Sequence, residues 1–169
     1  MKELDVLGVR VEMPTNNPIV LLRERDGQRY LPIWIAAPEA TAIAYAQQGV
    51  QPPRPLTHDL MVTLLQDLGH ELSEVRITNM QDNIFYAVLV VDGSTEISAR
   101  PSDAIALALR AAAPILASED VLATAGVMMA VEDEAEDEVE RFREFLNQVS
   151  AEDFEAGEDD PPAEPGGSR

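Results

Sequence analysis

The sequence contains no cysteine, which excludes disulfide bonds and thiolate metal sites. It also lacks any run of about 18 or more apolar residues, and no basic stretch precedes an apolar segment at its start. We therefore expect no membrane span and no secretory signal, and a cytoplasmic location is the default expectation. With 169 residues and 46% hydrophobic content, the chain is long enough to close one sizeable core.

Basic residues are scarce, since 12 Lys and Arg face 31 Asp and Glu, giving a formal net charge of −19. The imbalance is concentrated at residues 132–169, which contain 15 acidic and 3 basic residues. Residues 1–131 contain 16 acidic and 9 basic residues. Phosphate contacts dominate nucleic-acid affinity, so this field would repel a polyanion unless cations cluster locally or a metal ion intervenes.

One short pattern occurs twice. Residues 39–44 read EATAIA and residues 103–108, which begin 64 positions later, read DAIALA, so each copy is one acid followed by small helix-forming residues. Each copy also follows a strand-like run that ends near a proline. Because the repeat crosses a boundary between elements, we infer an internal duplication.

Hydrophobic periodicity predicts two similar units, at about residues 3–69 and 70–127, each with three strands followed by two helices. Turn signals at Asp26-Gly27, Asp82-Asn83 and Asp92-Gly93 separate strands, and Gly8 marks a bulge in the first strand. The predicted strands are 4–13, 19–22, 30–35, 71–79, 85–91 and 95–99, and the predicted helices are 38–48, 57–68, 101–112 and 118–124. The expected fold is an α+β domain over residues 1–131, made of duplicated β3-α2 units whose sheet is covered by helices on one face.

The composition changes abruptly after residue 131. Residues 132–150 place Val139, Phe142, Phe145, Leu146 and Val149 on one helical face, which predicts an amphipathic helix that docks on the domain or on a neighbouring subunit. Residues 151–169 are acidic and rich in Pro and Gly, and we expect them to be disordered. Such a tail either engages a basic partner or keeps the protein soluble.

A first candidate cluster lies where a stiff proline-rich segment meets a predicted helix start. Arg54, Thr57, His58 and Asp59 would lie at the N-terminus of this helix, where free N–H groups and the helix dipole favour anions. Histidine exchanges protons near neutral pH, so His58 could act as an acid or base. The structural alternative is that Thr57 caps the helix, Asp59 offsets its dipole and His58 is a surface residue. The other histidine, His70, follows Gly69 and is expected to face solvent.

A second cluster surrounds the start of the helix predicted at 101–112. Arg100, Ser102 and Asp103 lie there, and the repeat relates Asp103 to Glu39. Paired carboxylates can hold a divalent cation such as Mg²⁺ or Mn²⁺, and this ion could bridge to a phosphodiester. The alternative is that both acids neutralise helix N-termini and pair with arginines. No organic cofactor is expected.

Three segments together resemble the bifunctional nuclease (BFN) domain family, and the resemblance covers roughly residues 3–127. They are LPIWI at 31–35, PPRPLTHDL at 52–60 and ARPSDAIAL at 99–107. The resemblance implies a compact α+β domain of duplicated β3-α2 units, a tendency to form homo-oligomers, and nuclease activity on both RNA and DNA. The tail is similar to the C-terminal extension of actinobacterial members.

This chain departs from the family pattern at Ser98, where the family usually has an aspartate directly before Ala-Arg-Pro-Ser-Asp. A hydroxyl there weakens hard-cation binding. If that acid is catalytic in the family, activity here is in doubt, whereas if it only bonds Arg100, a serine can substitute at modest cost.

The leading hypothesis is a phosphodiester hydrolase or an inactive relative. In it His58, Asp59, Asp103 and Glu39 are the catalytic residues, with His58 transferring a proton and the acids at 39 and 103 holding a metal or activating water. The predicted substrate contacts are Arg54, Thr57, Arg100 and Ser102. The alternative is a non-catalytic, homo-oligomeric binding or regulatory module. The catalytic hypothesis requires these side chains to converge on one open pocket, whereas the alternative places them in reciprocal salt bridges.

Overall fold

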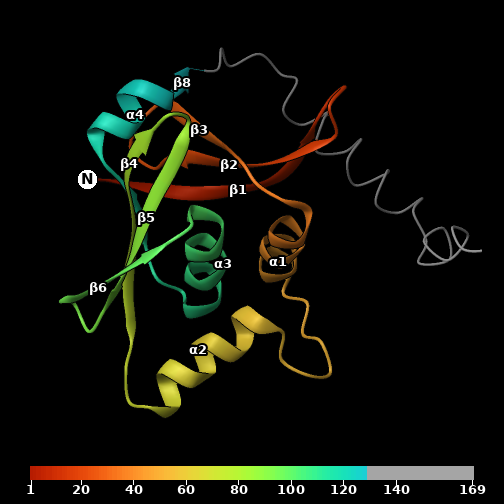
Figure 1. Ribbon diagram of the computed structural model, residues 1–169, viewed down its shortest axis with the longest axis vertical. Coiled ribbons are helices and arrows are strands. Elements are labelled where there is room, and N and C mark those ends of the chain that lie inside the picture. Colours follow the sequence, from red (N-terminus) through yellow and green to blue (C-terminus); the bar gives the residue numbers. More distant parts are fainter. Residues whose placement is uncertain (129–169) are drawn as a thin grey trace, which may run out of the picture. The chain divides into compact units, whose positions relative to one another are not determined.

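The computed structural model describes residues 1–128 of the chain (Figure 1). The helix predicted at 132–150, the tail predicted at 151–169 and the domain boundary predicted at 131 lie outside these residues. The elements, in chain order, are β1 (Lys2–Glu12), β2 (Asn17–Glu24), β3 (Arg29–Trp34), α1 (Ala37–Gln48), α2 (Thr57–Asp67), β4 (Leu72–Gln81), β5 (Ile84–Val91), β6 (Thr95–Ala99), α3 (Pro101–Ala111), β7 (Ile115–Ala117), α4 (Glu119–Ala125) and β8 (Val127–Met128).

The eight strands form one mixed sheet in the order β6-β5-β4-β7-β1-β2-β3-β8. Two antiparallel meanders, β1-β2-β3 and β4-β5-β6, confirm the predicted pairs of hairpins. Strand β7 joins them, because it pairs antiparallel with β1 and parallel with β4. The sequence does not predict β7, because its three residues are too few for a periodic signal.

Local turn chemistry follows the sequence closely. The β1–β2 register shifts between Val6 and Gly8, and Gly8 has a φ of 149°, so this glycine forms the predicted bulge. Asp82 and Asn83, the two residues between β4 and β5, both have positive φ, which is typical of hairpin turns that match the strand twist. Asp92 and Gly93, in the turn between β5 and β6, also have positive φ.

Helices α1 and α3 pack side by side against the sheet, α1 on β1 and β2 and α3 on β4 and β5 (Figure 1). Helix α3 supplies much of the core with small and branched residues at Ala104, Ile105, Ala106, Leu107 and Ala108, all essentially inaccessible to solvent. Helix α2 packs against α3. This arrangement brings the three helices together on one side of the molecule.

Helix α4 packs against both β3 and β4, although three strands separate these two in the sheet order. The sheet therefore curls toward α4. Ser118 caps this helix as predicted, because its Oγ accepts the backbone N–H of Val121 at 3.1 Å.

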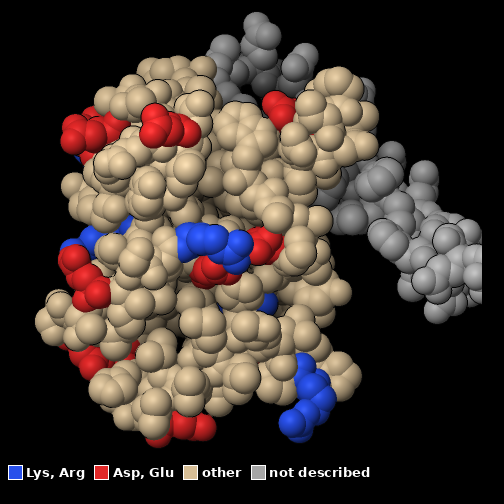
Figure 2. Space-filling view, in the orientation of Figure 1, with Lys and Arg blue, Asp and Glu red and all other residues tan. Residues whose placement is uncertain are grey.

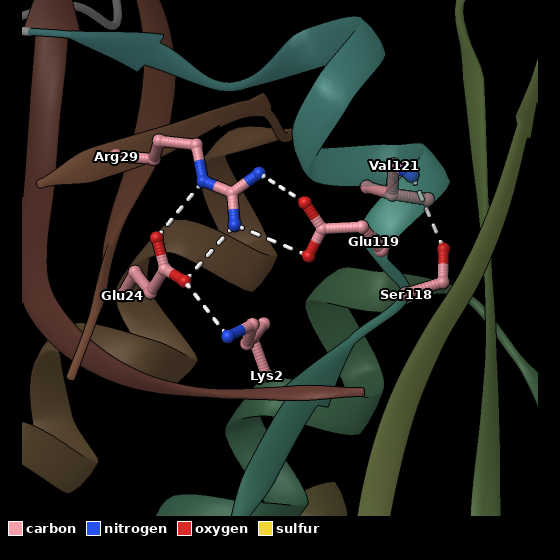
Figure 3. A network of polar contacts seen from close by, with 6 residues as sticks. All are labelled: Lys2, Glu24, Arg29, Ser118, Glu119 and Val121. Carbon is pink, nitrogen blue, oxygen red and sulfur yellow. Dashed lines mark hydrogen bonds and ion pairs between the residues drawn. The ribbon is translucent and has the colours of Figure 1, made fainter. Parts of the chain in front are cut away.

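An arginine fixes α4 to the edge of the first meander (Figure 3). Arg29 of β3 donates from Nε and Nη2 to the two carboxylate oxygens of Glu24, at 2.9 Å each, and from Nη1 to Glu119 of α4 at 2.7 Å. Glu24 is buried, and the hydrogen bonds from Arg29 hold the pKa of its carboxyl below the usual range although burial opposes the charge. Lys2 lies 3.9 Å from the same carboxylate.

Within residues 1–128, no helix is both long enough and apolar enough to cross a membrane.

Candidate active site

Four of the predicted site residues come together where the first turns of α1, α2 and α3 meet. His58 Nε2 lies 3.0 Å from Asp103 Oδ1, and Arg100 Nε donates to Asp103 Oδ2 at 2.7 Å. The Nη2 of Arg100 lies 2.8 Å from Glu39 Oε1. Figure 2 shows basic and acidic side chains next to each other at the centre of this face, where α1 and α3 lie in Figure 1.

The helix starts explain why these residues meet. Glu39 and Asp103 are the third residues of α1 and α3, and His58 is the second residue of α2. Prolines in the first turns of α1 and α3 suit positions whose N–H groups have no helical acceptor, and acids there oppose the positive end of the dipole. Because α1 and α2 both pack on α3, the three first turns become neighbours.

Asp103 is ionised at neutral pH. Burial favours its neutral form, but hydrogen bonds from Arg100 and His58 outweigh burial and keep the pKa of this carboxyl below its ordinary value. An ionised carboxylate only accepts hydrogen bonds, so Nε2 of His58 must carry the proton between them. In the neutral imidazole, Nδ1 is then the basic nitrogen.

The Nδ1 atom of His58 has no hydrogen-bond partner among the described residues. The only buried side-chain nitrogen or oxygen without a partner there is Glu39 Oε2. The His58 side chain as a whole is 15% exposed. An imidazole held at Nε2 by a carboxylate, with Nδ1 unpaired, is an arrangement that a general base can use.

Arg100 lies over both carboxylates and still faces solvent, with 64% of its side chain exposed. Asp103 and Glu39 raise the pKa of its guanidinium further, so it stays charged. Its Nη1 has no partner among residues 1–128. This nitrogen can therefore donate to an anion without breaking either ion pair.

Asp59 belongs to a second network. Arg110 of α3 donates from Nε to Asp59 Oδ1 at 2.5 Å, and its Nη1 donates to the carbonyls of Ala42 and Ala106. The hydrogen bond from Arg110 lowers the pKa of Asp59, with burial opposing and the N–H of Leu56 assisting. Arg110, which is 10% exposed and links three helices, was not among the candidates from the sequence. The signal that could have found it is one basic residue that directly follows an apolar run at 104–109.

The prediction that Thr57 caps α2 is wrong. The N-cap residue is Leu56, whose side chain cannot accept a hydrogen bond, and its N–H donates to Asp59 Oδ2 at 2.9 Å. Thr57 is exposed. Of the other predicted contacts, Arg54 is exposed and forms no ion pair within residues 1–128, and Ser102, which precedes Asp103 in the first turn of α3, is buried.

The acids at the cluster do not fit a resident divalent cation as they stand. Three of the four carboxylate oxygens of Glu39 and Asp103 are engaged by Arg100 or His58, which leaves only Glu39 Oε2. Mg²⁺ and Mn²⁺ prefer several oxygen ligands, and no three His, Asp or Glu side chains in the described part of the chain are grouped to hold a metal. Ser98, at the position where the resemblance suggested an acid, is exposed on β6.

The cluster has an open face rather than a deep cleft. A pocket of about 340 Å³ lies beside Asp59, with Val50, Gln51, Pro52, Pro53 and Pro55 as its other lining residues. A second one, of about 270 Å³, lies near His70, whose Nδ1 is 2.7 Å from Asp92. His58, Arg100 and Asp103 line neither.

Comparisons with known proteins agree on one family. Residues 20–130 match the family described as Bifunctional nuclease domain. An uncharacterised protein of Mycobacterium tuberculosis is 54% identical over 163 residues, which are 92% of this chain and 99% of that protein.

The chain is also similar to plant proteins that are named as nucleases. Bifunctional nuclease 1 of Oryza sativa subsp. japonica is 28% identical over 116 residues, covering 65% of this chain and 35% of the plant protein. Bifunctional nuclease 1 of Arabidopsis thaliana is 29% identical over 106 residues, covering 59% and 33%. The family match covers well over half of the chain, and the protein therefore belongs to the bifunctional nuclease domain family.

Proposed function

We propose that this protein hydrolyses phosphodiester bonds in RNA and DNA, with His58 as the group that transfers the proton and Asp103 as the residue that orients it. One observation carries the proposal: His58 Nε2 lies 3.0 Å from one oxygen of Asp103, and the charged, exposed Arg100 donates to the other oxygen of the same carboxylate. Hydrolysis of a phosphodiester requires a base that activates the attacking water and a cation that stabilises the negative charge on the phosphate. A histidine and an arginine on one carboxylate can supply these two groups.

In this mechanism Arg100 binds a non-bridging phosphate oxygen through Nη1. Nδ1 of His58 removes a proton from water as the water oxygen bonds to phosphorus. The bond from phosphorus to the leaving sugar oxygen then breaks, and that oxygen takes up a proton, which the imidazolium can return. Asp103 keeps the imidazole in the required tautomer and stabilises its charged form.

The other acids have supporting roles. Glu39 binds Nη2 of Arg100 while Asp103 accepts from Nε, and the two acids together fix where the free Nη1 points. Asp59 anchors the first turn of α2, the turn that carries His58. Neither requires contact with the substrate.

A non-catalytic module is the second candidate, and a specific observation favours it. Arg100 forms reciprocal ion pairs with both acids, and Arg54 lies outside the cluster. Contacts of this kind also stabilise a scaffold. Under this alternative the same residues hold three helices together, and the protein acts by binding.

The element order supports the proposed duplication. Each meander is followed by a helix whose third residue is an acid, Glu39 in α1 and Asp103 in α3. Duplication would explain why two equivalent acids flank one arginine. It would also explain why the cluster lies where the two halves meet.

A nuclease assay with matched variants tests the proposal. Purified protein is incubated with single-stranded RNA and DNA in Mg²⁺, Mn²⁺ or EDTA, beside His58→Ala, Asp103→Asn and His70→Ala proteins prepared identically. His70→Ala is the control, because His70 also pairs with an aspartate but lies outside the cluster. We expect at least a 100-fold loss in the first two variants and none in the control. Equal activity in all four proteins, or none in any, would support the binding module.

A further inference from the structure

The ion pairs at the cluster leave two groups free to act on a substrate. Within residues 1–128, both oxygens of Asp103 are paired, one with His58 and one with Arg100, and Glu39 Oε1 is paired with Arg100. Glu39 Oε2 is unpaired but buried. The groups that remain are Nδ1 of His58, which can take up a proton, and Nη1 of Arg100, which can donate to an anion.

These two groups suit some nucleophiles better than others. Water is a poor nucleophile at neutral pH unless a bound metal ion lowers its pKa. Holding such an ion requires open carboxylate oxygens, and neither Glu39 nor Asp103 has one that is both exposed and unpaired. A histidine base without a metal ion is better matched to a nucleophile that the substrate itself carries, because an internal group attacks without the entropic cost of bringing in a second molecule.

RNA carries such a nucleophile and DNA does not. The 2′-hydroxyl of each ribose lies beside the phosphate on the neighbouring 3′-oxygen, and it is the group by which a protein can tell RNA from DNA. We infer that the cluster cleaves RNA by attack of this 2′-hydroxyl on the adjacent phosphorus, with His58 Nδ1 as the base and Arg100 as the cation. The inference rests on the proposed function, to which it adds the nucleophile and a preference for RNA over DNA.

The reaction adds no atom to the strand. Nδ1 of His58 removes the proton of the 2′-hydroxyl as the 2′-oxygen bonds to phosphorus. The bond from phosphorus to the 5′-oxygen of the next nucleotide breaks, and this oxygen takes up a proton from solvent, to which the imidazolium returns its own. The products are a 2′,3′-cyclic phosphate and a 5′-hydroxyl. A DNA strand has no 2′-hydroxyl, so it is cut only by the slower attack of water.

A single carboxylate holds the base and the cation close together. His58 Nε2 lies 3.0 Å from Oδ1 of Asp103, and Nε of Arg100 donates to Oδ2 of the same side chain at 2.7 Å. The 2′-hydroxyl and the non-bridging oxygens belong to one ribose phosphate, so a base and a cation that act on them must be neighbours. The shared carboxylate meets this requirement with groups that need no metal ion between them.

A DNA strand that contains one ribonucleotide tests the inference, because it has a single internal 2′-hydroxyl. The full chain is incubated in EDTA with this strand, and with the same strand carrying a 2′-O-methyl group at that position. We expect a cut directly after the ribonucleotide, roughly 100-fold or more faster than at any deoxynucleotide, and no cut at the methylated position. Mass spectrometry should identify the new end as a 2′,3′-cyclic phosphate.

Two variants assign the cut to the cluster. His58→Ala should lose it by about 100-fold or more, whereas His70→Ala, which removes a histidine outside the cluster, should keep it. A cut that is as fast at deoxynucleotides, that requires Mg²⁺, or that leaves a 3′-hydroxyl and a 5′-phosphate would overturn the inference and leave the proposed hydrolysis standing. No cut in any strand with either EDTA or Mg²⁺, or an equal cut by His58→Ala, would overturn both.

Discussion

Replacing Arg110 should destabilise the fold more than replacing any exposed arginine, because this side chain joins three helices. Only 10% of it is exposed, and it donates to Asp59 and to the carbonyls of Ala42 and Ala106. Methionine keeps most of the length and apolar volume of the arginine while removing the charge and the donors. Arg110→Met therefore isolates the polar contribution.

The expected loss is about 3 kcal/mol in the free energy of unfolding. Removing one partner of a fully buried ion pair costs about 3–5 kcal/mol. The lower end applies here because 28% of the Asp59 side chain is exposed, and Leu56 still donates to it. In a double-mutant cycle with Asp59→Asn, the coupling between the two side chains should be about 2 kcal/mol.

Urea unfolding followed by far-ultraviolet circular dichroism measures these values, at one fixed protein concentration because self-association would shift the midpoint. Arg54→Met is the matched control, since Arg54 is exposed and has no ion pair within residues 1–128. Its free energy of unfolding should equal that of the wild type. The reasoning is refuted if Arg110→Met is as stable as this control, or if the cycle shows no coupling.

Three further outcomes are expected from the same unfolding measurements. The pKa of Glu24 is lowered from 4.5 in the fold, chiefly by Arg29, so its contribution to stability is present above pH 4.5 and is lost as the pH falls through the folded value. Glu24→Gln should accordingly unfold with a shallower pH dependence below 4.5 than the wild type, and an unchanged slope would contradict this. Ser118→Ala should lose about 1 kcal/mol, because the N–H of Val121 loses its acceptor, and Ser118→Asp, which can cap, should recover most of it. Leu107→Ala should lose about 3 kcal/mol through the cavity it leaves in α3, and a loss below about 1 kcal/mol would show that the core collapses around it.

Most of the fold could be predicted from local patterns. The six longer strands alternate or run apolar for five residues or more, and the turns between them carry residues that tolerate positive φ. Strands β7 and β8 could not be predicted, since they have three and two residues and exist only because neighbouring strands offer free edges. Tertiary pairing, not local preference, makes them strands.

The sequence indicated which residues lie at the candidate site, but not which side chains form ion pairs with each other. The repeat relates Glu39 to Asp103, and both are the third residues of their helices, while His58 is the second residue of the helix that starts at 57. Which acid each base would meet depends on the packing of α1 and α2 on α3, and no local pattern encodes that packing. For the same reason the sequence grouped Asp59 with His58, while the structure pairs Asp59 with Arg110.

The net negative charge of the chain would repel a polyanionic substrate, but the packing of the helices reduces the negative charge at the cluster itself. Glu39 and Asp103 each occupy the third position of a helix, and Arg100 pairs with both. A helix N-terminus carries roughly half an elementary positive charge, so the two of them together offset about half of the charge of these two acids. Arg100 neutralises most of the rest. A chain of net charge −19 can therefore present a nearly neutral surface at this cluster, where a phosphodiester would meet little local repulsion.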